Sequence, residues 1–444
     1  MPGDRDPTRR DFVMGAGAAM AASTASAAAS RVSYGVIGTG GQGCYLLGRM
    51  AGLANCRCVA VADVYEPNLK RGVAAAGSKP QAFTDYRKLL DRKDVEAVVV
   101  ATPLSTHFPI TRDALEAGKH VFCEPPLVFK REEIQALRAL AESRPNQVIQ
   151  VGLQRRYSRF YQIAKLMVSK GLIGNVTHIM AQWHRNPGWR IPPDPASDKD
   201  RNWMIFREYS GGLMAELGSH QIDVANWMFN LQPEYVIGIG GREFIRDGRD
   251  IFDNIQLIYR YRRGQKFIYT AISTNQQLPM FGGTRAEFGE RIMGTGGTIE
   301  ITYGQGDEPP IALWYYEPRP ALVNRGKGYE EPPLIGGATL GSLGNGRRGF
   351  PLLLEKDQFK GDESFLGKEL KYARRWLYSK GVMLPEEERD PVDVQMESFF
   401  NSCRTGDTPK ADLEVGLANS AAVILSNLAM DEERRVEFSE LEKS

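Results

Sequence analysis

The chain of 444 residues predicts an α/β protein whose first part is a doubly wound, parallel β-sheet. Two observations indicate this fold class. Between residues 31 and 152, short continuous apolar runs alternate with segments of helical periodicity, which is typical of parallel strands that helices cover on both faces. The first run leads directly into a glycine-rich turn, Gly38-Thr-Gly-Gly-Gln-Gly43, and then into a helix-compatible segment.

The glycine-rich turn has the spacing G-x-G-x-x-G, which is typical of a dinucleotide-binding strand–turn–helix. The first glycine allows a tight turn, the second lets the backbone approach a pyrophosphate, and the third lets the helix pack close to the strand. Free N–H groups and the helix dipole then favour the anion. The alternative is a glycine-rich turn in another kind of α/β protein. We expect the cofactor to contact Gly38, Gly40, Gly41, Gln42 and Gly43.

An acidic residue ends the second apolar run, which spans residues 57–62. Asp63 lies 63 − 43 = 20 residues beyond Gly43, where a carboxylate can bond the ribose hydroxyls of an adenosine. A carboxylate there also repels a 2′-phosphate. The sequence therefore predicts NAD as the cofactor, with NADP less favoured.

Three further apolar runs complete the expected sheet, at residues 95–102, 119–123 and 147–152, with helical segments at 110–117 and 132–141. Ligands of doubly wound sheets bind beyond the carboxyl ends of the strands. The residues that follow these strands are therefore further candidates for cofactor binding: Thr102, Pro103, His107, Glu124, Pro125 and Gln154.

The composition is that of an ordinary globular protein, with 42% hydrophobic and 25% charged residues. The length predicts two domains, which we place at 31–153 and 154–440. A net charge of +2 gives no reason to expect a nucleic-acid or membrane partner. The five scattered cysteines predict core residues or free thiols and no metal site.

The first 30 residues resemble an export signal. Thr8-Arg-Arg-Asp-Phe-Val-Met14 precedes an Ala-rich run at 15–29, which is too short to span a bilayer and contains the small residues Ala25-Ser-Ala27. This pattern predicts a twin-arginine signal and a periplasmic or exported protein; the alternative is a disordered tail with a chance arginine pair. A cofactor loaded before export would have to be held tightly and regenerated within the catalytic cycle.

The second domain begins with an expected strand at 176–183, and two further strands at 250–259 and 266–272 read as a hairpin. A strand at 298–302 follows, and then an irregular insertion at 304–361. Amphipathic helices at 392–405 and 413–432 end the chain and could pack back on the first domain.

A helix expected at 213–229 carries candidate catalytic residues. Glu216 and His220 are i, i+4 neighbours, so the carboxylate could orient the imidazole and stabilise its charged form. The alternative is an ion pair on a helix face with no catalytic role. The second domain also has aromatic residues next to polar residues, a combination that is typical of a carbohydrate-binding site. The alternative is that they are ordinary core aromatic residues beside solvated arginines. The candidate substrate-binding residues are Arg156, Trp183, His184, Trp189, Arg190, Trp203 and Asp223.

Three segments together resemble the Gfo/Idh/MocA family: Ala101-Thr-Pro103 with His107, residues 117–124, and residues 211–223. The resemblance covers roughly residues 32–303 and the C-terminal helices. It implies a Rossmann domain followed by an α+β domain with a mostly antiparallel open sheet, whose inner face closes the active site. The outer face commonly makes oligomer contacts, which implies a homodimer or homotetramer. It also implies hydride transfer between a nicotinamide and a sugar or polyol carbon, with His220 matching the family's catalytic histidine and Glu216 its usual aspartate.

The chain departs from the family at one catalytic position. The family's Glu-Lys-Pro triplet is Glu124-Pro125-Pro126 here, so proline replaces a lysine that normally acts as acid/base and substrate ligand. His220 is then the best candidate base, with Tyr157 and His184 as alternatives. Three functions stay open: an NAD(P)-dependent oxidoreductase acting on a sugar or polyol hydroxyl carbon, redox-neutral glycoside cleavage by transient oxidation and elimination, and a non-catalytic sugar-binding member of the fold.

Overall fold

The N-terminal domain is built on a six-stranded sheet with the strand order β3-β2-β1-β4-β5-β6. Every neighbouring pair in this sheet is parallel, which confirms the predicted doubly wound, Rossmann-type architecture. The strands are β1 (Val32–Ile37), β2 (Cys56–Ala62), β3 (Gln81–Phe83), β4 (Ala97–Val100), β5 (His120–Cys123) and β6 (Ile149–Val151). The helical segments between them are α2 (Gly41–Met50), α3 (Glu66–Ala75), α4 (Tyr86–Leu90), η1 (Leu104–Thr106), α5 (His107–Glu116) and α6 (Arg131–Glu142).

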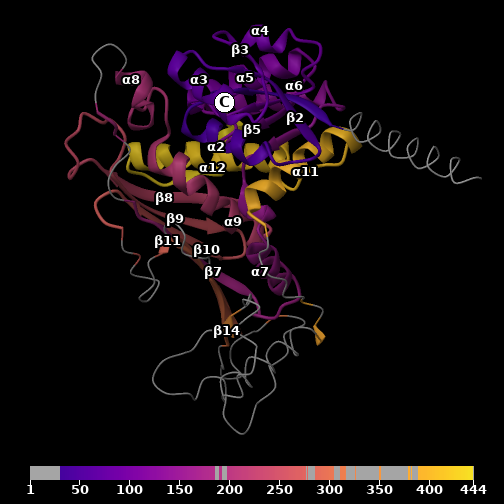
Figure 1. Ribbon diagram of the computed structural model, residues 1–444. Coiled ribbons are helices and arrows are strands. Elements are labelled where there is room, and N and C mark those ends of the chain that lie inside the picture. The colour runs from indigo at the N-terminus through magenta and orange to yellow at the C-terminus, as the bar shows by residue number, and fades with distance from the viewer. Residues whose placement is uncertain are drawn as a thin grey trace, which may run out of the picture.

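The computed structural model describes residues 31–185, 190–192, 198–276, 278, 286–304, 311–316, 326, 350–351, 379–380, 382 and 389–443. The predicted signal at 1–30 lies outside these residues, as do Trp189 and most of the expected insertion at 304–361. Figure 1 shows the N-terminal sheet and its helices on one side and the second sheet on the other, with α12 between them.

The second domain is built on a nine-stranded sheet with the order β14-β13-β12-β11-β7-β10-β9-β8-β15. Only β7 and β10 run parallel, so the expectation of a mostly antiparallel sheet is confirmed. The strands are β7 (Val176–Trp183), β8 (Pro233–Gly241), β9 (Asn254–Tyr261), β10 (Lys266–Ile272), β11 (Ala286–Gly294), β12 (Gly297–Gly304), β13 (Ile311–Tyr316), β14 (Phe350–Pro351) and β15 (Val436–Glu437).

Two strands lie inside the segment that the sequence predicts as an irregular insertion. β13 pairs with β12 along its whole length, and Trp314 is fully buried. This strand was not predicted because its alternating pattern is short and lies within a segment rich in glycine and proline.

Helices cover the inner face of the second sheet and connect it to the first domain. These segments are η2 (Gln154–Tyr157), α7 (Arg159–Ser169), α8 (Asp198–Arg201), η3 (Trp203–Ile205), the π-helical turn η4 (Met214–Gly218), α9 (Ser219–Phe229), α11 (Pro391–Thr405), α12 (Leu413–Asp431) and η6 (Phe438–Lys443). The inner face carries buried aromatic side chains such as Tyr259, Phe267 and Tyr269, which form the largest core with α9 and α12.

The two C-terminal helices pack back on the first domain. α11 contacts α2 and β1, and Arg49 donates to Asp393 at 2.7 Å across this contact. α12 contacts α6 and β6 of the first domain and β8 and α9 of the second. By length and composition α12 could cross a membrane, but 61% of its apolar window is buried inside the protein. Its apolar character is therefore accounted for by its position in the core.

Candidate active site

The glycine-rich turn between β1 and α2 forms an open cradle. Gly38 has φ +89°, and a Cβ on it would collide with the backbone carbonyl of Ala101. A Cβ on Gly43 would collide with the carbonyl of Gly38, so α2 can approach β1 only with glycine there. By contrast, a Cβ on Gly40 would meet only the Nδ2 of Asn68, at 3.9 Å, and a Cβ on Gly41 would meet nothing within 4 Å. Space above the turn together with the helix N-terminus fits a dinucleotide pyrophosphate.

Asp63 holds this turn in place. Its Oδ2 accepts from the backbone N–H of Thr39 at 2.7 Å, and its Oδ1 accepts from the N–H of Tyr65 at 2.8 Å. The carboxylate is only half-buried at the end of β2, beside the turn, where a ribose would follow the pyrophosphate. The described residues therefore fit a nicotinamide dinucleotide.

His107 lies at the strand ends where the sequence placed it, but its ring is buried between two loops. Its ring is 3% exposed, with Nδ1 2.8 Å from the carbonyl of Pro126 and Nε2 2.9 Å from the carbonyl of Thr102. The ring lies between the loops after β4 and β5, and burial lowers the pKa of this imidazole, whose neutral form donates to one of the two carbonyls. Thr102, whose hydroxyl accepts from Thr106 at 2.8 Å, and Pro103 lie half-buried at the strand end, as predicted from the sequence.

Two carboxyl groups, Glu124 of the first domain and Glu216 of the second, have raised pKa values. Glu124 follows β5, and removal from bulk water raises its pKa to about 7, helped by repulsion from Glu216 and opposed by a hydrogen bond from Gln42. Glu216 lies on η4, and the same desolvation raises its pKa to about 7, opposed by a hydrogen bond from the Ser210 hydroxyl at 2.8 Å. The pKa of Glu124 therefore depends on Gln42 of the glycine-rich turn and on Glu216 of the second domain.

The predicted dyad of Glu216 and His220 does not form as expected. The helix expected at 213–229 begins with a π-helical turn that contains Glu216, and α9 follows with His220. Among the described residues Glu216 and His220 form no hydrogen bond or ion pair with each other, and Nδ1 of His220 has no hydrogen-bond partner. Burial lowers the pKa of His220 to about 3, and the nearby Arg155 guanidinium lowers it further. The imidazole is therefore neutral, and the expectation that a carboxylate stabilises its charged form is wrong.

A buried ion pair lies beneath this histidine. Arg155 donates to Glu290 at 2.6 Å, with the two side chains 4% and 0% exposed, and Tyr161 donates to the second oxygen of Glu290 at 2.7 Å. The guanidinium lies 5.4 Å from the ring of Trp183, and that ring is 6.1 Å from His220. The sequence analysis missed Arg155 and Glu290. The available signal was Glu290, a charged residue at a buried position of β11, which requires a partner.

Three other candidates are used elsewhere in the fold. Arg156 forms a two-pronged ion pair with Asp223, with closest contacts of 2.7 and 2.9 Å, so both predicted substrate ligands are already paired with each other. Tyr157 is 2% exposed, and its hydroxyl lies against Ser398 and the backbone of Lys410 and Ala411. The hydroxyl of Tyr157 is therefore buried against the C-terminal segment, and its catalytic role stays a prediction.

The remaining candidates occupy different environments. His184 is 5% exposed, and its Nε2 lies 3.2 Å from the hydroxyl of Thr270 on β10. Gln154 is half-buried at the start of η2, on the edge that carries Glu124. Trp203 is half-buried on η3, and Arg190 is half-buried close enough to Asp247 to lower the pKa of that carboxyl. Of the predicted aromatic residues described, Trp183 is the one whose ring contacts His220.

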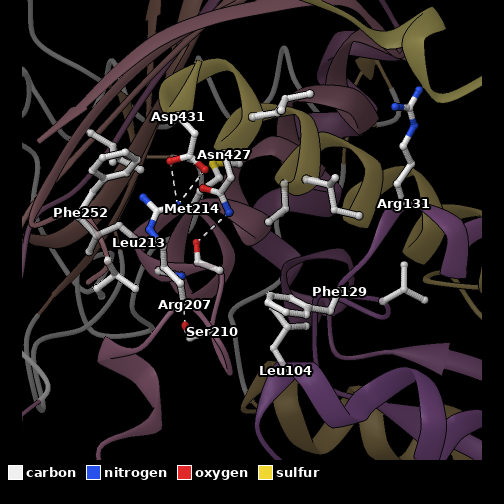
Figure 2. Close-up of a pocket in the computed structure, with 18 residues that line it drawn as sticks. Leu104, Phe129, Arg131, Arg207, Ser210, Leu213, Met214, Phe252, Asn427 and Asp431 are labelled. Atoms are coloured by element: carbon white, nitrogen blue, oxygen red, sulfur yellow. Dashed lines mark hydrogen bonds and ion pairs between the residues drawn. The ribbon is translucent and has the colours of Figure 1, made fainter. Parts of the chain in front are cut away.

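A cavity of about 370 Å³ lies behind the loop that leads to Glu216 (Figure 2). Its walls come from both domains and from α12, and Figure 2 shows Arg207 in contact with Asp431, at 2.8 Å. None of the predicted catalytic, cofactor-binding or substrate-binding residues lines it, although the first residues of the family segment 211–223 do. Ser210 lines the cavity and also bonds Glu216, so it connects the two regions.

The sheet order and the glycine cradle define a two-domain, dinucleotide-binding protein. Residues 32–153 match the model of the oxidoreductase family with an NAD-binding Rossmann fold, and residues 161–300 match the GFO/IDH/MocA C-terminal domain. The chain belongs to the Gfo/Idh/MocA family of NAD-binding oxidoreductases, which confirms the family resemblance seen in the sequence.

Related proteins of known name include dehydrogenases of inositols. The chain is 30% identical over 297 residues to inositol 2-dehydrogenase of Rubrobacter xylanophilus, covering 67% of this chain and 74% of the relative. It is 26% identical over 291 residues to myo-inositol 2-dehydrogenase of Thermotoga maritima, covering 64% and 81%.

Solved structures show the same fold. Aldose–aldose oxidoreductase from Caulobacter crescentus superposes with a TM-score of 0.64 at 18% identity, covering 92% of this chain and 99% of that one. Scyllo-inositol dehydrogenase from Lactobacillus casei, with bound NAD(H) and scyllo-inositol, superposes with a TM-score of 0.60 at 18% identity and the same coverage.

Proposed function

We propose that the chain is an NAD-dependent oxidoreductase that transfers a hydride between a tightly held nicotinamide and a CH–OH carbon of a sugar or polyol. The observation that carries this proposal is the neutral imidazole of His220, which lies beside the ring of Trp183 and whose buried Nδ1 has no hydrogen-bond partner. A neutral imidazole can accept a hydrogen bond from a substrate hydroxyl, and the indole ring offers an apolar face to sugar C–H groups. The inositol dehydrogenases among the relatives support a polyol-like substrate.

Asp63 supports NAD over NADP. Its carboxylate is held by two backbone N–H groups at the end of β2, so a 2′-phosphate placed there would meet a fixed negative charge. The cradle formed by Gly38, Gly40 and Gly43 would hold the pyrophosphate. A bound nicotinamide supplies the hydride acceptor, and the protein residues supply binding, orientation and proton transfer.

A panel of substrates tests the proposal. The purified protein is examined for nicotinamide absorbance and then mixed with sugars, polyols and nitrophenyl glycosides. A rise of the reduced-nicotinamide band without release of the nitrophenol supports hydride transfer from a hydroxyl carbon. Absence of bound or bindable dinucleotide would refute it and would leave a non-catalytic sugar-binding protein.

Redox-neutral glycoside cleavage is the second candidate, favoured by the loss of the family lysine at Pro125 and by the protonatable carboxyl groups beside it. In this reaction, transient oxidation of a hydroxyl acidifies the adjacent C–H, and the aglycone leaves by elimination. Release of nitrophenol with no net reduction of the nicotinamide identifies it in the same panel.

We also propose that residues 1–30 direct export by the twin-arginine route. This route carries folded proteins, so a cofactor bound before export would travel with the protein. Replacing Arg9 and Arg10 together by lysine should retain the protein in the cytoplasm, as seen by cell fractionation. Unchanged export of that variant would contradict the assignment.

A homo-oligomer through the outer face of the second sheet is the remaining proposal. Ile237, Ile258 and Ile268 lie side by side on β8, β9 and β10, and Ile239 of β8 is 68% exposed. Such a row of exposed apolar side chains is typical of an interface. Ile258→Lys should give a monomer by light scattering, whereas Phe244→Lys, an exposed control outside the strands, should not.

A further inference from the structure

The cavity in Figure 2 lies outside the proposed catalytic site, since neither His220 nor Trp183 lines it. We propose that this cavity binds a second ligand, a compact monocarboxylic acid with an apolar body. Its carboxylate would lie at Arg131 and its apolar body in the cavity. This binding site goes beyond the proposed hydride transfer and does not depend on it.

The volume and the walls of the cavity fit the apolar body of such an acid. A volume of about 370 Å³ lies toward the lower end of the range of small-molecule sites. Most of the lining side chains are apolar, and they come from the loops after β4 and β5, from η4 and the loop before it, from the segment before β9, and from α12. Examples are Leu104, Phe129, Leu213, Met214, Phe252 and Leu428. Burial of an apolar ligand against these walls removes apolar surface of both from water, which is favourable.

The other polar side chains in these walls already have partners within the protein. Arg207 forms an ion pair with Asp431 at 2.8 Å. Asn427 donates to the carbonyl of Gly211 at 3.0 Å, and the Ser210 hydroxyl donates to the carboxyl group described above. Since their hydrogen-bonding groups are used, these residues give the body of the ligand little reason to be polar.

Arg131 is the lining residue whose charge is not compensated. Its side chain is half-buried, its Nε is buried without a hydrogen-bond partner, and within the described ranges its guanidinium forms no ion pair. The charge of Arg131 lowers the pKa of Glu440, but that carboxylate already accepts from Arg434 at 2.9 and 2.8 Å. Arg131 is also the first residue of α6, where the positive end of the helix dipole disfavours a cation and favours an anion. A ligand carboxylate would supply the missing counter-charge.

The two charged ends of the cavity set the orientation of the ligand. Figure 2 shows Arg131 at one side of the lining residues and the pair of Arg207 and Asp431 at the other, with apolar side chains between them. An acid whose carboxylate lies at Arg131 therefore directs its apolar body toward that pair. A second carboxylate at the far end would meet a guanidinium that Asp431 already neutralises, so the cavity favours a monoacid over a diacid.

Titration calorimetry of the full chain with octanoate, octanol and octanedioate tests the class of ligand. Octanoate should bind saturably, and octanol and octanedioate should each bind about 3- to 5-fold more weakly. In Arg131→Gln the preference for octanoate over octanol should disappear, because the counter-charge is gone. Arg138→Gln is the matched control, since Arg138 lies on the same helix, pairs with Glu414 at 2.9 Å and does not line the cavity. This control should keep the preference of the wild type.

Filling the cavity tests where the ligand lies. Leu428→Trp and Ile424→Phe each place a larger side chain in the cavity from α12, and each should weaken octanoate and octanol alike by about tenfold or more. Two variants are used so that one that unfolds, as circular dichroism will show, leaves the other to decide.

Three results would overturn the proposal. The first is the absence of saturable octanoate binding to the wild type at millimolar concentration. The second is equal affinity of the wild type for octanoate and octanol, or a preference for octanoate that persists in Arg131→Gln. The third is unchanged octanoate binding in a folded variant whose cavity is filled. None of these results depends on turnover of a sugar or polyol, so failure of the proposed function would be seen separately.

Discussion

The ion pair of Arg155 and Glu290 allows a quantitative test of how the site beneath His220 is held. Both side chains are almost fully buried, their contact is 2.6 Å, and Tyr161 donates to the same carboxylate. Glu290→Gln keeps the size of the side chain but leaves the guanidinium without a counter-charge. Breaking a buried pair in this way destabilises a protein by about 3–5 kcal/mol. That loss corresponds to a fall in Tm of about 6–20 °C for a domain of 150–250 residues.

The assay is thermal unfolding at equal cofactor loading, with two comparison variants. In Glu300→Gln a less buried pair with Arg291 at 2.6 Å on the neighbouring strands is broken; the guanidinium of Arg291 is 33% exposed, so water can solvate it and the expected loss of stability is smaller than in Glu290→Gln. The double variant Arg155→Met with Glu290→Leu replaces the pair by apolar side chains, and should recover most of the stability. A Tm of Glu290→Gln that falls no further than that of Glu300→Gln would refute the reasoning.

Three further predictions concern the site. His220→Ala should lower kcat about 10²–10⁴-fold and keep the nicotinamide bound, as absorbance of the purified variant will show; full activity would remove His220 from the mechanism. Asp63→Ala should weaken NAD more than NADP in titration calorimetry, and an unchanged NAD affinity would contradict the ribose assignment. Because the folded-state pKa values of Glu124 and Glu216 are raised to about 7, the folded state binds more protons than the unfolded one. Their contribution to stability is therefore present below the unfolded pKa and is lost as pH rises toward neutrality, so Glu216→Gln should flatten the fall of Tm over that range; an unchanged slope would contradict the raised pKa.

Local sequence rules were sufficient for the first domain. The turn from Gly38 to Gly43, the acid at Asp63 and the continuous apolar strands each depend on neighbours close in the chain, and the parallel sheet follows from them. The antiparallel sheet of the second domain was predicted from the family resemblance. Periodicity alone predicts single hairpins and does not show how they combine into one sheet.

The arrangement of the catalytic residues could not be derived in the same way. Spacing put Glu216 and His220 on one helical face, but in the structure Glu216 bonds Ser210 and His220 lies against Trp183, contacts that depend on the tertiary structure. Arg155 and Glu290 are 135 residues apart, so their pairing depends on how η2 packs on the second sheet. Arg156 and Tyr157 looked like site residues because the sequence does not show that the segment around Lys410 covers them.

The position of α11 and α12 has a consequence for the order in which the protein folds. The last described helices cover β1, β6 and α6, so the first domain lacks part of its hydrophobic cover until residues 391–431 have been synthesised. We therefore expect the first domain to complete its folding only after residues 391–431 have been synthesised. Truncation before α12 should leave both domains without part of their core.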